Sequence, residues 1–165
     1  MQQRTFDEVV EQVTRQLPRG VFLNVGGQTP NTMTMGWGGI TYFWRKPVFI
    51  APVRPQRFTY ACIQAQRAFT VSVPLHDMQV ELAKAGMLSG RDGDKFAAIG
   101  LTPLPAQCVD APIVAQCELH LECRVLAATD FTQEGTEREI VESIYPTHDF
   151  HTLFFGEIVA CYSSV

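Results

Sequence analysis

The sequence predicts one mostly β domain over residues 1–165, a small and mainly antiparallel barrel with a few short peripheral helices. Three observations support this fold class. Short runs rich in β-branched and aromatic residues recur between Gly, Pro and Asn. Most connections between these runs are too short for the crossover helices of a parallel sheet. The chain is 46% hydrophobic over 165 residues, which suits one domain with its own core and excludes a disordered chain.

The first half of the chain is expected to contain two helices and three strands. Apolar residues at helical spacing predict a helix over residues 6–17 that ends at Pro18 and Gly20. A second, short helix is expected over 57–66, opened by Pro55. Alternating or continuous apolar runs predict the strands 21–25, 31–42 and 47–53.

The second half is expected to continue with strands and two more helical segments. A helix is predicted over 77–87, with Asp77 as its cap and Gly90 just beyond its end. A single helical turn is predicted over 94–100. The predicted strands are 68–73, a long alternating strand 113–126, 139–145 and 151–162.

The charge is low and unevenly distributed. Charged residues make up 18% of the chain, which suggests that a partner subunit covers part of the surface, and the net charge of −4 argues against nucleic-acid binding. No Asp or Glu occurs over residues 12–76, although that stretch contains Arg15, Arg19, Arg45, Lys46, Arg54, Arg57 and Arg67. Arginine matches phosphate and carboxylate groups well, so this segment predicts a site for an anionic small molecule. For any single arginine, a solvated or paired charge on a loop is an equally good interpretation.

The sequence favours a cytoplasmic protein. The longest notable uncharged stretch, 21–44, is interrupted by polar residues, Pro30 and glycines, so no membrane span is predicted, and no secretory signal opens the chain. The five cysteines are odd in number and form no Cys-x-x-Cys pair, which indicates reduced thiols. His148 and His151 are three residues apart ahead of a strand, so a metal pair is not expected.

Residues 31–38, Asn-Thr-Met-Thr-Met-Gly-Trp-Gly, are unusual for a strand. Alternation places Asn31, Met33, Met35 and Trp37 on one face, where an amide, soft side chains and an indole suit a flat heteroaromatic ring. The competing interpretation is a glycine-kinked barrel strand with its Met and Trp side chains in the core. The nearby Gly36-Trp37-Gly38-Gly39 is not a dinucleotide fingerprint, because a strand follows it instead of a helix.

Two segments are suited to an anion. Residues 54–60 place two guanidinium groups and a hydroxyl at a helix start, where backbone N–H groups and the helix dipole favour a phosphate. Residues 89–96 combine Ser, Gly, Arg and Lys in one loop, although Asp92 and Asp94 provide alternative partners for these bases. With a flat-ring face, two anion sites and no evident acid–base pair, the sequence matches what a flavin mononucleotide site needs, because that cofactor carries the chemistry.

These motifs, in this order, resemble the flavin reductase family in its flavoredoxin-like branch. The resemblance covers roughly residues 18–160 and includes 46–50, 52–59, 69–74, 89–96, 120–123 and 151–158. It implies an FMN-binding split β-barrel of Greek-key-like topology, acting as a homodimer with FMN near the interface. The resemblance implies these cofactor-binding residues: Asn31, Met33, Thr34 and Trp37 along the isoalloxazine; Arg54, Arg57 and Thr59; Ser89, Gly90, Arg91 and Lys95 near ribityl or phosphate; and His151.

The chain departs from the family pattern at three points. Phe58 replaces the usual Tyr, Ala85-Gly86 stands where the family often has Cys-Gly, and the sequence ends at Val165, so a C-terminal cover over the flavin is not expected. His120 lies with Glu118 and Glu122 on the polar face of its predicted strand, where a solvated or hydrogen-bonded histidine is expected and a flavin contact is left open.

The resulting functional hypothesis is an FMN-dependent oxidoreductase that transfers reducing equivalents from NADH or NADPH to flavin or another acceptor, with no catalytic acid or base assigned. One alternative is an FMN-carrying electron-transfer protein of flavoredoxin type, reduced by a protein donor. Another is a cofactor-free barrel that acts as a binding module. The sequence leaves open the choice of nicotinamide cofactor, the physiological acceptor or donor, the redox potential and the subunit that supplies each phosphate contact.

Overall fold

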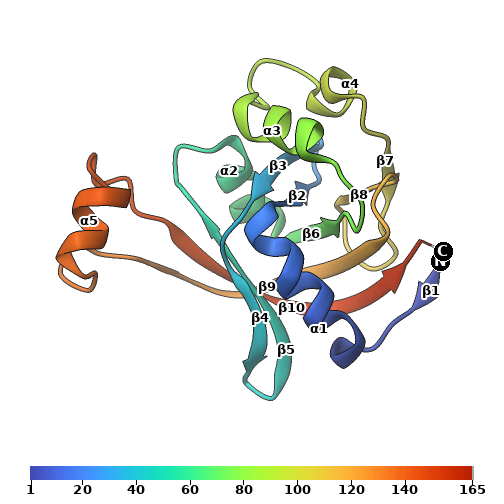
Figure 1. The fold of residues 1–165 in the computed structure, drawn as a ribbon, viewed down its shortest axis with the longest axis horizontal. Helices are drawn as coiled ribbons and strands as arrows, with labels where there is room; N and C mark the ends of the chain where they lie inside the picture. The colour runs from blue at the N-terminus through green and yellow to red at the C-terminus, as the bar shows by residue number, and fades with distance from the viewer. Residues whose placement is uncertain (165) are drawn as a thin grey trace.

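In the computed structural model, which describes residues 1–164, one antiparallel sheet forms the centre of the fold (Figure 1). Its strand order is β3-β2-β6-β9-β10-β5-β4, with β1 paired to the far end of β10, and a separate pair is formed by β7 and β8. The strands are β1 Gln2–Gln3, β2 Val21–Val25, β3 Asn31–Met35, β4 Gly39–Phe43, β5 Lys46–Val53, β6 Ala68–Val73, β7 Pro103–Pro105, β8 Pro112–Val114, β9 Leu119–Asp130 and β10 Thr152–Ser163. The predicted mostly β, antiparallel fold class is confirmed.

The short β3–β4 connection requires the sheet to curl. These strands lie at opposite ends of the seven-strand path, where a flat sheet would separate them by about 29 Å. Only residues 36–38 connect them, and such a link spans at most about 14 Å. The sheet therefore closes on itself like a barrel, with an unpaired seam between β3 and β4.

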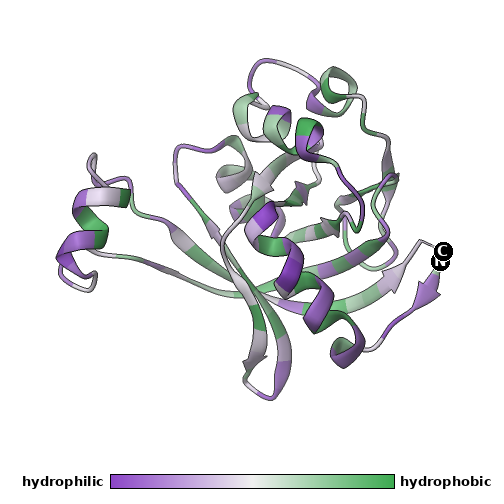
Figure 2. Cartoon of the chain, viewed as in Figure 1, coloured by the Kyte–Doolittle hydropathy of each residue, from purple (hydrophilic) through white to green (hydrophobic). Residues whose placement is uncertain are grey.

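Five α-helices and one 3-10 turn lie outside the sheet within the described chain: α1 Phe6–Gln16, η1 Leu17–Arg19, α2 Phe58–Gln66, α3 Gln79–Met87, α4 Lys95–Ile99 and α5 Arg138–Ile144. Helix α1 begins with a capping box in which the Thr5 backbone N–H donates to Glu8 at 2.6 Å. Its apolar side packs on the barrel through the fully buried Val9 and Val13. Figure 2 shows the opposite character on its outer side, which is mostly hydrophilic.

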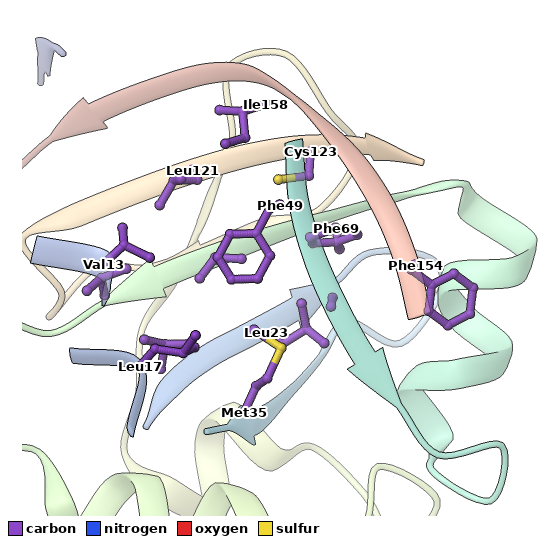
Figure 3. Close-up of a cluster of buried hydrophobic side chains, with 14 of the residues drawn as sticks. Val13, Leu17, Leu23, Met35, Phe49, Phe69, Leu121, Cys123, Phe154 and Ile158 are labelled. Atoms are coloured by element: carbon purple, nitrogen blue, oxygen red, sulfur yellow. The ribbon is translucent and has the colours of Figure 1, made fainter. Parts of the chain in front are cut away.

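The main core fills the inside of the curled sheet. Figure 3 shows side chains from different strands meeting there, among them Leu23, Phe49, Phe69 and Leu121. Gly156 on β10 leaves room for this packing, because a Cβ there would come within 2.6 Å of the Phe69 ring. A second cluster packs beneath α3 and α4 and includes Phe22, Leu82, Phe96 and Ile99. Both helices thus pack on Phe22 of β2, and the Thr34 hydroxyl of β3 donates to the Leu82 carbonyl of α3.

Three expected elements differ from the structure. The predicted strand 31–42 is two strands, β3 and β4, because the chain leaves the sheet at residues 36–38. The predicted strand 113–126 is broken by a turn and becomes β8 and β9. The predicted strand 139–145 is wrong: this segment is the helix α5. Its residues Ile140, Val141 and Ile144 have helical spacing, and their β-branched character suggested a strand.

Helix α5 lies on an arm formed by residues 131–150, which extends away from the barrel between β9 and β10 (Figure 1). None of the α5 residues is buried. The predicted cap of α3 also needs correction, because Met78 occupies the cap position. The Asp77 carboxylate accepts a hydrogen bond from the Gln79 backbone N–H at 3.1 Å and so still contributes to this end of the helix.

For the polar face of β9 a solvated or hydrogen-bonded His120 was expected, and the structure shows the hydrogen-bonded alternative, with His120 between the Ser72 and Ser164 hydroxyls on a buried face. His120 and Glu122 have no exposed surface. The Glu122 carboxylate accepts hydrogen bonds from the Tyr162 hydroxyl and from the backbone N–H groups of Gln107, Cys108 and Val109, at 2.6–3.1 Å. The loop before β8 thus covers the polar residues at alternate positions of β9. The alternating pattern of a strand does not reveal that a loop will cover its polar face.

No helix of residues 1–164 combines the length and the apolar character that crossing a lipid bilayer requires.

Candidate functional site

Two adjoining cavities lie along β3, between the start of α2, the end of β5 and the α3–α4 loop. The first cavity has a volume of ≈ 220 Å³ and the second ≈ 340 Å³. Met33 and Arg57 line both, so the two cavities adjoin. The first is lined by Met33, Thr34, Met35, Gly36, Trp37, Pro52, Arg54, Arg57 and His151. The second is lined by Asn31, Met33, Gln56, Arg57, Phe58, Thr59, Met87, Leu88, Ser89, Gly90, Arg91 and Lys95.

Every predicted site residue lines one of these cavities. The first cavity contains Met33, Thr34, Trp37, Arg54, Arg57 and His151 of the predicted set. The second contains Asn31, Met33, Arg57, Thr59, Ser89, Gly90, Arg91 and Lys95. Residues from position 31 to position 151 of the chain thus converge on one side of β3. His120, for which a contact was left open, lines neither cavity.

The first cavity has an aromatic wall. The Trp37 and His151 rings lie 5.1 Å apart, centroid to centroid, and the indole is 50% exposed. Trp37, in the loop after β3, therefore is not a core residue, whereas Met35, the last residue of β3, is 4% exposed and belongs to the main core (Figure 3). The flat-ring interpretation fits Trp37, and the competing core interpretation fits Met35.

His151 is neutral at physiological pH. Burial is the main cause that lowers its pKa to about 4, and the positive charge of Arg54 adds to the effect. Its Nδ1 lies 2.9 Å from the Tyr145 hydroxyl, which comes from the arm. The imidazole thus serves the first cavity as an uncharged ring.

Arg54 is not a free anion ligand. Its guanidinium forms an ion pair with Asp149 and donates to the Ile144 carbonyl at 3.1 Å. The hydrogen bond from Arg54 to the Asp149 carboxylate holds the pKa of that carboxyl well below its usual range. From the sequence, Arg54 was expected to support a phosphate. In the structure its charge is largely compensated, and it fastens the arm to the edge of the first cavity.

The second cavity concentrates positive charge. Arg57, Arg91 and Lys95 line it, and no acidic residue is among its lining residues within the described chain. Their hydrogen bonds go to backbone carbonyls: Arg57 to Gly86 at 3.3 Å, Arg91 to Gln56 at 3.0 Å and Lys95 to Ala85 at 2.7 Å. Since a carbonyl accepts without cancelling the charge, three cations remain available to a multiply charged anion.

Lys95 is the most deeply placed of these cations, with only 4% of its surface exposed. Burial, followed by repulsion from Arg57, lowers its pKa to about 8. A phosphate beside the ammonium would restore the ordinary pKa, so this buried charge favours an anionic ligand.

Asn31 has an unpartnered buried oxygen at the wall of the second cavity. Its amide nitrogen donates to the Thr59 hydroxyl at 2.9 Å, while Oδ1 has no hydrogen-bond partner in the described part of the chain. A Cβ at position 90 would lie 2.5 Å from that oxygen and 2.5 Å from the Phe58 ring, so only glycine fits there. A ligand with a hydroxyl or N–H group can satisfy this acceptor, which otherwise costs free energy.

The α2 helix adds to this anion-binding character. Its nine residues begin at Phe58, and Phe58 and Thr59 of the first turn line the second cavity. The unpaired N–H groups and the positive end of the helix dipole favour an anion there. A flavin mononucleotide would match the two cavities: a flat ring for the aromatic one, and a hydroxyl chain with a phosphate for the cationic one.

Several cavity residues were not among the predicted cofactor-binding residues. Met35, which the alternation of 31–37 had placed on the flat-ring face, lines the first cavity, and Gly36, Pro52, Gln56, Phe58, Met87 and Leu88 also line the cavities. Gln56 and Phe58 lie inside the segment 54–60, so proximity in sequence was an available signal. The arm residues Tyr145 and Asp149 gave no signal, because they act through contacts with His151 and Arg54 that only the tertiary fold creates.

Gly38 lies in the loop that carries Trp37, where the backbone packs closely against β5. Gly38 has φ +123°, and a Cβ there would come within 2.3 Å of the Ile50 carbonyl oxygen on β5. The close backbone approach at Gly38 is therefore to a neighbouring strand. This contact fixes the loop that carries Trp37 at the edge of the first cavity.

Solved structures with a similar fold are known. A flavoredoxin of Desulfovibrio vulgaris (Miyazaki F) has a similar structure, with a TM-score of 0.69 and 27% identity, over 87% of this chain and 68% of that one. An NADH:FAD oxidoreductase of Streptomyces globisporus C-1027 matches with a TM-score of 0.69 over 87% of this chain and 74% of that one, and at 19% identity it supports the fold alone.

Sequence comparison identifies the family. An uncharacterized protein of Archaeoglobus fulgidus is 31% identical over 153 residues, which is 92% of this chain and 76% of the relative. The family described as "Flavin reductase like domain" matches residues 14–164. That match extends from within α1 to the end of β10 and includes every residue of both cavities. The chain therefore belongs to the flavin reductase-like domain family.

Proposed function

We propose that this protein is an FMN-dependent oxidoreductase that transfers reducing equivalents from NADH or NADPH to flavin or another acceptor. The observation that carries the proposal is the pairing of an aromatic cavity with a cavity lined by three cations, joined at Met33 and Arg57. The family match and the flavoredoxin similarity support a flavin as the ligand.

Each cavity would hold a different part of the cofactor. Arg57, Arg91 and Lys95 would neutralise the phosphate, with Ser89 as a further donor. Asn31 would bind a polar group between phosphate and ring through its free Oδ1. Met33, Thr34, Trp37 and His151 would flank the isoalloxazine.

Bound FMN would supply the redox chemistry, so the side chains need to bind, orient and exclude water. The lining of the first cavity agrees with that division. Its ionisable groups within the described chain are Arg54, Arg57 and His151, and His151 is neutral at pH 7 because burial lowers its pKa to about 4. The proposal therefore assigns no catalytic acid or base.

A second candidate is an FMN-carrying electron-transfer protein of flavoredoxin type. The specific observation in its favour is the 27% identity to a flavoredoxin over 87% of the chain. The half-exposed indole of Trp37 leaves one wall of the first cavity open to either a nicotinamide or a docking protein. Fast reduction by a ferredoxin with slow oxidation of NAD(P)H would select the carrier.

We also propose that the protein forms a cytoplasmic homodimer with FMN near the interface. The tip of the β4–β5 hairpin presents Tyr42, Phe43 and Trp44 with 58%, 43% and 57% of their surfaces exposed. Aromatic side chains gathered at the surface are typical of protein interfaces. Light scattering of the FMN-loaded protein tests the dimer, and a monomer at micromolar concentration would contradict it.

The first experiment is a flavin titration followed by visible absorption and fluorescence. We expect tight FMN binding by the unmodified protein and a loss of roughly 10- to 100-fold in Arg57→Ala, the range for one charge-assisted contact. Arg15→Ala is the matched control, because Arg15 is an exposed arginine on α1 outside both cavities. A protein that ignores FMN would leave the cofactor-free barrel as the better hypothesis.

Activity is then measured as NADH and NADPH oxidation with FMN, FAD, ferric chelates and quinones as acceptors. Turnover with either nicotinamide supports the oxidoreductase. FMN binding without any such turnover would reject the enzyme and retain the carrier.

A further inference from the structure

The arm formed by residues 131–150 reaches the first cavity through one side chain, Tyr145. Although α5 itself has no buried residue, Tyr145 directly after it is only 3% exposed. Its ring packs against Phe150 at 4.7 Å and meets the His151 ring edge-on at 5.6 Å, and the Arg54 guanidinium lies over it at 5.3 Å. Tyr145 is thus the point at which the arm contacts the site.

The hydroxyl of Tyr145 forms a directed hydrogen bond to His151. The two atoms, Tyr145 Oη and His151 Nδ1, lie 2.9 Å apart in a buried setting. A phenol O–H is a stronger proton donor than a neutral imidazole N–H, and an imidazole nitrogen is a better acceptor than a phenol oxygen, so the Tyr145 hydroxyl donates and His151 Nδ1 accepts.

A neutral imidazole carries one proton, so a protonless Nδ1 puts the hydrogen on Nε2. Within residues 1–164 this Nε2 has no hydrogen-bond partner, and it is not one of the side-chain atoms sealed from solvent. His151 lines the first cavity next to Trp37. Nε2–H is therefore a free donor at the wall of that cavity.

We propose that Tyr145 is a positioning residue that fixes the tautomer of His151, so that Nε2–H is offered as a hydrogen-bond donor to a carbonyl or imine acceptor of a planar ring in the first cavity. The ligand class, a flat heterocycle with an acceptor at its edge, rests on the proposed function, whereas the tautomer does not. This gives the arm a role in ligand recognition.

The ion pair at the base of the arm supports this role. Arg54, directly after β5, binds the arm at the Ile144 carbonyl and at the Asp149 carboxylate. These two positions lie on either side of Tyr145 in the sequence. Gln56 also donates to Asp149 at 2.7 Å. These contacts hold the phenol in place while α5 remains exposed, so a distant surface segment can position a ring atom inside the site.

The tautomer can be read directly in the flavin-free protein. Long-range ¹H–¹⁵N spectra at pH 7.5 of protein labelled in its histidine rings distinguish a protonated from an unprotonated ring nitrogen, and the loss of signals in His151→Gln identifies His151. We expect Nε2 protonated in the unmodified protein. In Tyr145→Phe, which retains the ring and loses the hydroxyl, we expect a mixture of both tautomers.

Tyr60→Phe is the matched control, since its hydroxyl accepts from Gln64 at 3.0 Å and lies outside both cavities. It should leave the His151 signals unchanged. Near-ultraviolet circular dichroism checks that each variant keeps the native packing. A protonated Nδ1 in the unmodified protein, or a His151 spectrum in folded Tyr145→Phe identical to the unmodified one, would overturn the proposal.

The second measurement is FMN affinity. Losing one hydrogen bond is worth roughly three- to tenfold in affinity, so Tyr145→Phe should weaken FMN binding by that factor and Tyr60→Phe should not. His151→Gln, whose amide can place an N–H near the position of Nε2, should lose less affinity than His151→Leu. Equal losses in these two would reject the donor role. A protein with the expected tautomer that binds no FMN would instead reject the proposed function.

Discussion

The buried cation Lys95 predicts that FMN binding weakens as the pH rises above 8. In the flavin-free protein the pKa of Lys95 is lowered to about 8, because its side chain is buried and Arg57 is close. A bound phosphate favours the charged lysine and raises that pKa again. Binding above pH 8 must therefore take up a proton, so affinity falls with increasing pH.

The size of the effect follows from the protonated fraction. With a pKa of about 8, Lys95 is almost fully charged at pH 7 and only about one-tenth charged at pH 9. If the bound state keeps it charged at both values, the dissociation constant of FMN rises about tenfold between pH 7 and pH 9, or about 1.4 kcal/mol. Below pH 7 this contribution is constant.

The assay is a fluorescence titration with FMN at pH 7, 8 and 9 at one ionic strength. Lys95→Met should bind FMN more weakly at pH 7 and should lose the Lys95-linked tenfold drop. Lys84→Met is the control, since Lys84 lies exposed on the nearby α3 outside both cavities and should behave like the unmodified protein. Equal affinity of the unmodified protein at pH 7 and 9, or an undiminished drop in Lys95→Met, would refute this account.

Three further predictions concern stability and packing. Gly90→Ala should destabilise the flavin-free protein by about 1–3 kcal/mol in urea unfolding, because the added Cβ would overlap both Asn31 and Phe58. An unchanged urea midpoint would contradict this close packing at position 90. Glu122→Gln should cost about 2–3 kcal/mol in the same assay, because an amide cannot accept all four hydrogen bonds that the carboxylate accepts. A loss below about 0.5 kcal/mol, the usual range for surface substitutions, would contradict that role. Burial lowers the pKa values of His120 and His151 to about 4, so the unfolded chain takes up protons below pH 6.5 before the folded chain does. The free energy of unfolding should therefore fall by about 2 kcal/mol for each histidine between pH 7 and pH 5. Replacing His120 by Gln should reduce that fall.

Local patterns were sufficient for most of the elements. Apolar spacing of 3.6 residues predicted α1, and strand-like runs predicted β2, β5, β6 and β10, because burial of one face imposes the period of the element. The pattern misled at 139–145, where α5 lies on an arm without buried residues. Without a core to impose a face, β-branched composition outweighed the helical spacing.

The sequence alone also determined which residue types form the site. The amide, the methionines and the indole of 31–37, the arginines of 54–57 and the Ser-Gly-Arg and Lys of 89–95 are all chemistry that can be identified before folding. Their combination matched what one flavin mononucleotide site needs, the family resemblance implied the same, and all of them line the two cavities along β3.

Only the tertiary structure decided how the charges are used. Arg54 and Arg57 are close in sequence, yet Arg54 is paired with Asp149, 95 positions away, while Arg57 keeps its charge for the cavities. Likewise His120 and His151 differ in role because one is sealed between Ser72 and Ser164 and the other faces a cavity from beside Tyr145. The physical reason is that a sequence specifies which groups can ionise or donate, whereas their burial and their partners depend on contacts between segments that are distant along the chain.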